Sequence, residues 1–208
     1  MRKRKHTQDG VTYTSHELHL SGVWMVQRTP HTDERGEFDR LYDPALLALV
    51  VGAHLKVAQL ALVKNPAEGT LRGLHYQLPP CQEQKLVWAM RGSVLDVVLD
   101  LRAGSPTWGK AAQVQLQAGD GRGVYVPPGC AHGYLTMEPD SWVQYATSAP
   151  YSPEHARGVH WLAAQKNWWP GEVRLVSERD EALPCQELQL QLDGSYAYPL
   201  PRLPGWRP

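Results

Sequence analysis

The chain has 208 residues with 21 basic and 21 acidic side chains, a size that suits one domain with a full hydrophobic core. The balanced charge creates no overall field that would attract nucleic acid or an anionic membrane surface. Three scattered cysteines, none in a C-x-x-C pair, indicate neither a disulfide framework nor a zinc site.

The N-terminal part of the chain is basic and polar, and residues 1–17 read as a loose tail. No apolar stretch follows the basic start, so it is not a signal peptide, and apolar runs such as residues 46–51 are far too short to span a bilayer. We therefore expect a soluble, cytoplasmic protein. Residues 18–38 predict a strand, a polar turn and a second strand. Residues 43–54 are the best helix candidate, because Asp43 can cap the helix, Pro44 suits its first turn and Gly52 can end it.

The middle of the chain consists of short β-prone segments between glycines and prolines. Many short strands at this spacing are typical of a β-sandwich or barrel. We predict a mainly β fold, an antiparallel β-sandwich or jelly-roll barrel with a few short helices, over residues 18–185, and a proline-containing C-terminal segment over residues 186–208. The predicted strands lie in HLKVAQLALV, GTLRGLHYQL, KLVWAMRG, SVLDVVLDLR, AAQVQLQ, GVYVPP, GYLTME and WVQYATS.

Two stretches in this region resemble the motifs of cupins, small β-barrels that hold a metal ion. GRGVYVPPGCAH (121–132) has the G-x5-P-x-G-x2-H spacing of the later cupin motif, although a plain hairpin would also account for it. In the earlier motif the usual H-x-H pair is replaced by His75-Tyr76-Gln77, and an acidic ligand is at best displaced to Glu83. Two imidazoles are too few for a first-row metal, and an amide oxygen is a poor third ligand. We expect no bound metal and no other cofactor.

A closer resemblance rests on DERGEF at residues 33–38 followed, in this order, by LRGLHYQ, EQKLV, DVVLDLR, SPTWGK, YVPPGCAHGY, QYATSAPYSPE and SERD. Over residues 20–185 the chain resembles the dTDP-4-dehydrorhamnose 3,5-epimerase family. The resemblance implies a metal-independent, homodimeric isomerase of cupin fold that acts on a 4-keto-6-deoxy nucleotide-diphosphate sugar, as in dTDP-rhamnose biosynthesis. Departures from the family pattern at residues 39–40, 58–66 and 160–173 leave open the nucleotide, the sugar, and whether C3, C5 or both are epimerised.

Epimerisation next to a ketone removes a proton from a weakly acidic carbon and returns it to the opposite face. The reaction needs a base with a near-neutral pKa, an acid across the sugar ring, and a charge that stabilises the enolate oxygen. The resemblance assigns these catalytic roles to His75 as base with Asp180 as its partner, to Tyr145 as acid, and to Lys85 beside the C4 ketone. Tyr151 is the reserve acid and also a substrate-binding candidate. Taken singly, each residue also fits a structural role, such as a core histidine, a helix cap, a core aromatic residue or a strand-edge lysine.

Two arginines are candidates for binding the diphosphate. The resemblance implies that Arg72 grips it in bidentate fashion. Arg72 and His75 are three positions apart and would face opposite sides of a regular strand, so we expect an irregularity at Arg72–Gly73. Arg35 could reach across a dimer interface built partly from residues 18–40, or could only stabilise a turn with Asp33.

Four further polar residues have open roles. Gln77 is expected to hydrogen-bond the substrate or the base. His132 either orients the sugar or is a buried residue bonded to the backbone. Asp96 could reach His75 or Lys85, and Asp100 could reach Arg102.

Three alternative functions stay open on the sequence alone. The first is an epimerase or isomerase that acts at a single carbon of a different nucleotide sugar. The second is a metal-dependent cupin oxygenase or isomerase. The third is a non-catalytic cupin that only binds a sugar nucleotide, although such a protein would not need both an acid and a base.

Overall fold

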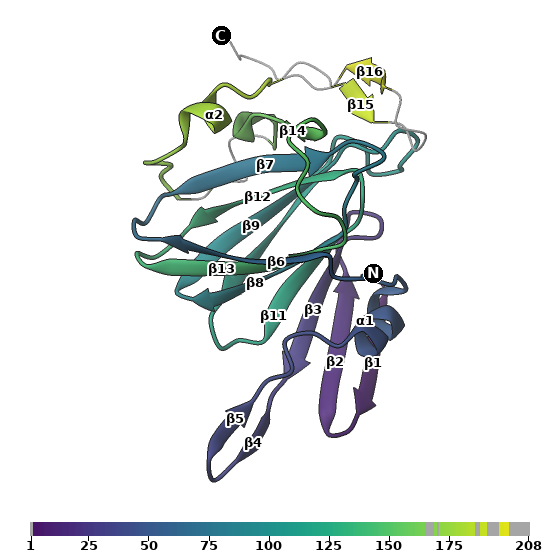
Figure 1. The fold of residues 1–208 in the computed structure, drawn as a ribbon, viewed down its shortest axis with the longest axis vertical. Coiled ribbons are helices and arrows are strands. Elements are labelled where there is room, and N and C mark those ends of the chain that lie inside the picture. Colours follow the sequence, from purple (N-terminus) through teal and green to yellow (C-terminus); the bar gives the residue numbers. More distant parts are fainter. Residues whose placement is uncertain (1, 165–168, 170, 186–187, 191–195, 200–208) are drawn as a thin grey trace.

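Two antiparallel β-sheets pack face to face (Figure 1). The computed structural model describes residues 2–164, 169, 171–185, 188–190 and 196–199. The larger sheet has the strand order β1-β2-β3-β11-β8-β13-β6, and the smaller has the order β10-β9-β12-β7-β14. The predicted antiparallel β-sandwich with a few short helices is therefore confirmed. The sandwich strands are β1 Lys3–Gln8, β2 Val11–Glu17, β3 Trp24–Thr29, β6 Gln59–Asn65, β7 Leu71–Gln77, β8 Lys85–Arg91, β9 Ser93–Asp100, β10 Ala111–Gln117, β11 Arg122–Val126, β12 Cys130–Thr136, β13 Ser141–Thr147 and β14 Ala156–Gly158.

Strands β6 to β13 overlap the eight segments predicted between glycines and prolines. Strand β9 shows why its sequence does not alternate cleanly, because all eight of its residues are buried. Val94 and Val98 pack between the two sheets, whereas Leu95, Val97 and Leu99 pack on the outer side of the smaller sheet. A strand covered on both faces has no need for a polar side.

The expected tail at residues 1–17 is wrong. Residues 3–8 and 11–17 form the hairpin β1–β2, which extends the larger sheet. Every second residue of β2 is buried, beginning with Val11 and Tyr13, but Ser15 and Glu17 make this alternation look polar. Both polar groups have partners, because Ser15 donates to the Val50 carbonyl at 2.6 Å and Glu17 pairs with Arg2. Burial of polar residues is tolerated when such hydrogen bonds form.

The predicted helix is confirmed as α1, Pro44–Val51. The Asp43 side chain accepts hydrogen bonds from the amides of Ala45 and Leu46, both at 3.0 Å. Gly52 ends the helix in the left-handed conformation at φ 78°, which glycine adopts at little cost. The helix covers the outer face of the larger sheet, where its buried leucines and valines contact side chains of β2, β3 and β8.

Residues 18–38 contain more strands than predicted. After β3, the short strands β4 His31–Asp33 and β5 Gly36–Phe38 form a separate hairpin. All six residues of these two strands are exposed, and Figure 1 shows the hairpin projecting away from the sandwich. Among the described residues none buries Phe38, which is 59% exposed.

The C-terminal part covers the outer side of the smaller sheet. It contains the 3₁₀ helix η1 Trp161–Ala164 and the short helix α2 Glu178–Glu181, followed by the paired strands β15 Leu188–Leu190 and β16 Tyr196–Pro199. Most of the predicted C-terminal segment, residues 186–208, lies outside the described residues. Within the described part of the chain, no helix is long and apolar enough to cross a membrane.

Candidate active site

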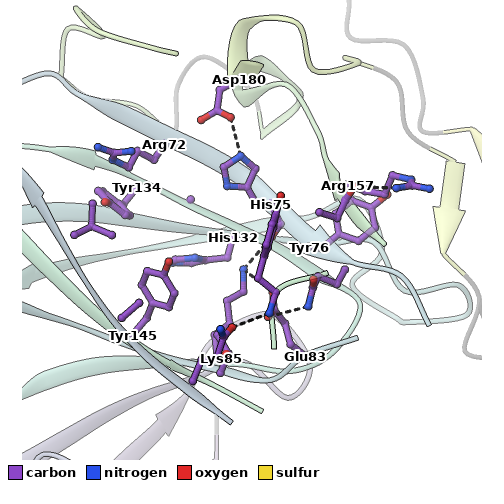
Figure 2. A pocket seen from close by; sticks show the side chains of 18 of the residues that line it. Arg72, His75, Tyr76, Glu83, Lys85, His132, Tyr134, Tyr145, Arg157 and Asp180 are labelled. Atoms are coloured by element: carbon purple, nitrogen blue, oxygen red, sulfur yellow. Dashed lines mark hydrogen bonds and ion pairs between the residues drawn. The ribbon is translucent and has the colours of Figure 1, made fainter. Parts of the chain in front are cut away.

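A cavity of about 490 Å³ opens between the two sheets and collects most of the predicted site residues (Figure 2). Its wall includes all four predicted catalytic residues, His75, Lys85, Tyr145 and Asp180. The predicted substrate-binding residues that also line it are Arg72, Gln77, His132 and Tyr151. Arg35 does not line the cavity. Its guanidinium is exposed on the β4–β5 hairpin and pairs with Asp33 of the same turn at 2.5 Å.

The expected irregularity at Arg72–Gly73 is confirmed. His132 stands opposite His75 and Tyr134 opposite Arg72, so β7 has one residue more than β12 between these two pairs. Gly73 has φ 112°, and a Cβ there would lie 2.7 Å from the Cα of Gly133. Only glycine fits such a close backbone approach. The bulge is the reason that Arg72 and His75, three positions apart, both reach the cavity.

His75 and Asp180 form a hydrogen-bonded pair at one side of the cavity. The His75 Nε2 lies 2.7 Å from the Asp180 Oδ1, and the Asp180 Oδ2 accepts a hydrogen bond from the Gly73 amide at 3.1 Å. Ser177 caps α2, and its hydroxyl accepts a hydrogen bond from the Asp180 amide. This bond fixes the backbone that carries the Asp180 carboxylate. Burial by itself raises the pKa of Asp180, but the hydrogen bonds from His75 and Gly73 and the imidazole charge outweigh burial and leave this pKa below 3.8, its ordinary value.

Lys85 lies across the cavity with a carboxylate beside it. The Lys85 Nζ is 3.1 Å from the Glu83 Oε1, and both side chains are 11% exposed. Lys85 also donates to the His75 carbonyl at 3.4 Å. Glu83 was considered on the sequence only as a displaced metal ligand. Its spacing of two residues from Lys85, which places both on one face of an extended segment, could have suggested the pair.

Gln77 is buried, and its amide group is engaged by protein atoms. The Nε2 donates to the carbonyls of Cys81 and Pro150 at 3.0 and 3.1 Å, and the Oε1 accepts from the Ser152 amide at 2.6 Å. Its Nε2 also lies 3.3 Å from the Glu83 Oε2. Gln77 thus ties together the two loops that border the cavity, while a hydrogen bond to substrate stays a prediction.

Tyr145 projects into the cavity from β13 of the larger sheet, whereas His75 projects from β7 of the smaller sheet. Figure 2 shows His75 beside Asp180 on one side, with Tyr145 and Lys85 on the other. Burial, together with the Glu83 charge, raises the pKa of Tyr145, although Arg72 opposes the shift. The phenol therefore keeps its proton at neutral pH and can act as a donor. Two phenols that were not predicted as site residues, Tyr76 and Tyr134, also line the cavity.

His132 forms a second histidine–carboxylate pair. Its Nε2 lies 2.7 Å from the Asp96 Oδ2, and both residues are buried. The prediction that Asp96 reaches His75 or Lys85 is wrong. Asp96 of β9 stands opposite Tyr134 of β12, and its carboxylate bonds the diagonal neighbour His132 instead. His132 is likewise bonded to a side chain rather than to the backbone. The predicted pair of Asp100 with Arg102 is confirmed at 2.8 Å.

Three arginines line the cavity, Arg72, Arg157 and Arg179. Sequence reasoning missed the last two, which lie in the short strand β14 and in the helix α2. Arg157 donates to the carbonyls of Glu154 and Ala156 at 2.9 and 2.8 Å. Among the described residues none of these three guanidinium groups has a carboxylate within 4.0 Å. Their charges are therefore available to an anionic ligand.

Each of the two cupin-motif histidines has a carboxylate partner of its own. Within the described residues, no group of three or more histidine, cysteine, aspartate or glutamate side chains could hold a metal ion. The metal content of the protein itself stays a prediction. What the geometry offers is a hydrogen-bonded imidazole facing a phenol and an ammonium group across a cavity that a sugar could occupy.

Comparisons with known proteins agree with this chemistry. Residues 17–187 match the family model described as dTDP-4-dehydrorhamnose 3,5-epimerase. A dTDP-4-dehydrorhamnose 3,5-epimerase of Sinorhizobium fredii is 43% identical over 174 residues, which cover 80% of this chain and 86% of that protein. A 4-keto-6-deoxy sugar epimerase from the novobiocin cluster of Streptomyces spheroides superposes with a TM-score of 0.75 at 34% identity, covering 82% and 85% of the two chains. A 3'-monoepimerase from Streptomyces bikiniensis in complex with dTDP-quinovose superposes equally well, with a TM-score of 0.75 at 31% identity and coverage of 81% and 86%.

Proposed function

The chain belongs to the dTDP-4-dehydrorhamnose 3,5-epimerase family, and we propose that it epimerises a 4-keto-6-deoxy nucleotide-diphosphate sugar at C3, C5 or both. The observation on which this proposal mainly rests is that the base and acid candidates project from opposite sheets into one cavity. A sugar ring held between them would present one face to His75 and the other to Tyr145. Inversion at carbon requires this two-sided access, which a protein that only binds a sugar does not need.

His75 is the base. Its Nε2 is hydrogen-bonded to Asp180, so the Nε2 carries the proton and the Nδ1 is the nitrogen that accepts one from the substrate. Imidazole suits this role because one ring nitrogen can take up a proton while the other keeps its own. The Asp180 carboxylate stabilises the imidazolium that forms, as in other histidine–aspartate pairs.

Lys85 and Tyr145 complete the reaction. Loss of the proton next to the ketone places negative charge on the C4 oxygen, and the Lys85 ammonium stabilises that enolate. Tyr145 then donates its phenolic proton to carbon from the other face, which inverts the centre. His132 orients the sugar from the floor of the cavity, where Asp96 holds its ring.

Substrate binding follows from the arginines in the cavity lining. Arg72 binds the diphosphate, and Arg157 and Arg179 add positive charge to the same cavity. Guanidinium groups suit phosphates because two N–H groups can bind two oxygens at once. Tyr151, which is 55% exposed, is a further substrate-binding residue and the reserve acid.

The protein is a homodimer built partly from residues 18–40. Among the described strands β6 is the last of the larger sheet and has no partner on its outer edge. Its side chains Leu60 and Leu62 are exposed, as is Phe38 of the projecting hairpin. Free sheet edges and exposed apolar side chains favour association. In such a dimer Arg35 of each hairpin reaches the partner's cavity and contacts a phosphate.

Three other predictions from the sequence complete the proposal. The enzymatic domain spans residues 18–185, with the correction that β1 and β2 extend its larger sheet. The enzyme uses no metal or cofactor. It acts in the cytoplasm.

The test is deuterium incorporation from D2O into a dTDP-linked 4-keto-6-deoxy sugar, followed by NMR. Label at C3 and C5 with inversion at both carbons identifies a 3,5-epimerase, and label at C3 alone identifies the activity of the monoepimerase relative. No label at either carbon, with a folded protein, would reject the proposed function. The same substrate linked to CDP or GDP defines the nucleotide.

A further inference from the structure

Asn65, the last residue of β6, is fully buried beside the cavity and has a defined amide orientation. Its Nδ2 donates to the Ser141 carbonyl at 2.9 Å and lies 3.4 Å from the Tyr134 hydroxyl. Because the Ser141 carbonyl can only accept, the amide nitrogen must face it. The Asn65 Oδ1 therefore faces Arg72, whose Nε donates to it at 2.8 Å.

We propose that Asn65 is a positioning residue that orients Arg72 toward the phosphate groups of the substrate without neutralising its charge. This inference rests on the proposed function for the identity of the anion. Arg72 is exposed to the cavity, but one edge of its guanidinium is fixed by a residue that is 0% exposed. The bond uses only the Nε, so both Nη groups stay free to bind two phosphate oxygens.

A neutral amide partner distinguishes Arg72 from three basic side chains of the cavity that have carboxylate partners. Lys85 is paired with Glu83, His75 with Asp180 and His132 with Asp96. Arg72 is held by a neutral group instead. A carboxylate at position 65 would give the same Nε bond but would also cancel the charge that attracts the phosphate. An amide supplies direction and leaves the charge unpaired.

The experiment measures binding of inorganic pyrophosphate and turnover of the nucleotide sugar in Asn65→Ala, Arg72→Ala and the double variant. We expect Asn65→Ala to weaken pyrophosphate binding by about tenfold, the size of one charge-assisted hydrogen bond, and to raise KM while kcat at saturation changes little. In the Arg72→Ala background the Asn65 substitution should have no further effect on pyrophosphate, because Asn65 acts through Arg72. Equal losses in both backgrounds, or a loss of kcat alone, would show a purely structural role and overturn the inference.

Arg72→Lys keeps the experiment decisive if the Asn65 variants do not fold. Lysine keeps the positive charge but lacks the fork that Asn65 orients, so pyrophosphate affinity should fall nearly as far as in Arg72→Ala. Wild-type affinity in Arg72→Lys would overturn the inference, as would a wild-type protein that does not bind pyrophosphate. Pyrophosphate binding does not depend on turnover, so an absence of deuterium incorporation with intact Asn65–Arg72 coupling would reject only the proposed function.

Discussion

Replacement of Asp180 by asparagine tests the assignment of His75 as base, because the surroundings of Asp180 dictate how the new amide must lie. The Asp180 Oδ2 accepts from the Gly73 amide at 3.1 Å, and the Oδ1 contacts the His75 Nε2 at 2.7 Å. In Asp180→Asn the side-chain oxygen stays with the Gly73 N–H, so the NH2 group faces His75. The imidazole must then accept at Nε2 and carry its proton on Nδ1, the nitrogen that should take the substrate proton.

The size of the effect has two parts. Loss of the hydrogen bond between the carboxylate and the imidazolium costs about 1.5–3 kcal/mol in the transition state. Restoring the active tautomer requires the amide to flip, which leaves the buried Gly73 N–H without an acceptor and costs about 1–3 kcal/mol. Together these losses reach about 2.5–6 kcal/mol, which corresponds to a decrease in kcat of roughly 10²–10⁴-fold.

The assay is product formation at saturating 4-keto-6-deoxy nucleotide sugar, with deuterium incorporation measured in parallel. Both should fall together, since the proton is removed by the same group. Glu181→Gln is the matched control, because Glu181 follows Asp180 on α2 and its carboxylate lies 3.4 Å from the His160 Nε2, not beside His75. Its kcat should equal that of the wild type. A kcat for Asp180→Asn within about threefold of wild type, a difference below 1 kcal/mol, would refute the assignment of His75 as a base tuned by Asp180.

Four other predictions follow from the site and the sheet edges. His75→Ala should abolish both deuterium incorporation and product formation. Tyr145→Phe should form product about 10²–10⁴-fold more slowly but keep some deuterium exchange through His75. If Tyr145→Phe turns over at the wild-type rate, Tyr151 becomes the next candidate for the acid. Folding lowers the pKa of Asp180, so wild type should be more stable than Asp180→Asn above the unfolded-state pKa of about 3.9 and should lose this advantage as pH falls through the pKa of the folded state. Urea unfolding of both proteins at pH 6 and below pH 4 measures the difference in the free energy of unfolding. A difference that does not change with pH contradicts the prediction. Light scattering at micromolar concentration should give the mass of a dimer, and a monomer would count against the proposed interface. Elemental analysis of untagged protein should find no stoichiometric transition metal, and one metal per chain would overturn the metal-free reaction.

Several features were readable in the sequence because their signals are local. Asp43, Pro44 and Gly52 delimit α1 through contacts within a few residues. Glycines and prolines separate the strands of the sandwich because turns need their backbone geometry. The bulge at Gly73 was also predictable, since Arg72 and His75 could share a cavity only if the strand broke its alternation.

Other features depended on which strands become neighbours. The hairpin β1–β2 was missed because the buried Ser15 and Glu17 disguise an inward-facing row, and only their partners on other elements explain their burial. The partner predicted for Asp96 was wrong, because the register of β9 against β12 places Asp96 diagonally across from His132. Asn65 gave no signal in the sequence, since its importance comes entirely from the side chain it holds.

By itself the sequence determined the fold class and the family, and it predicted the residues proposed to remove and return a proton, because these follow from residue type and from the order of short blocks. The tertiary structure decided how those residues are paired. His75 and Asp180 are 105 positions apart, and His132 and Asp96 are 36 apart, so their contacts exist only after two sheets close around one cavity. Distances between such residues are set by strand register, the Gly73 bulge and the anchoring of α2. These are properties of the packed chain, which no local pattern of residues encodes.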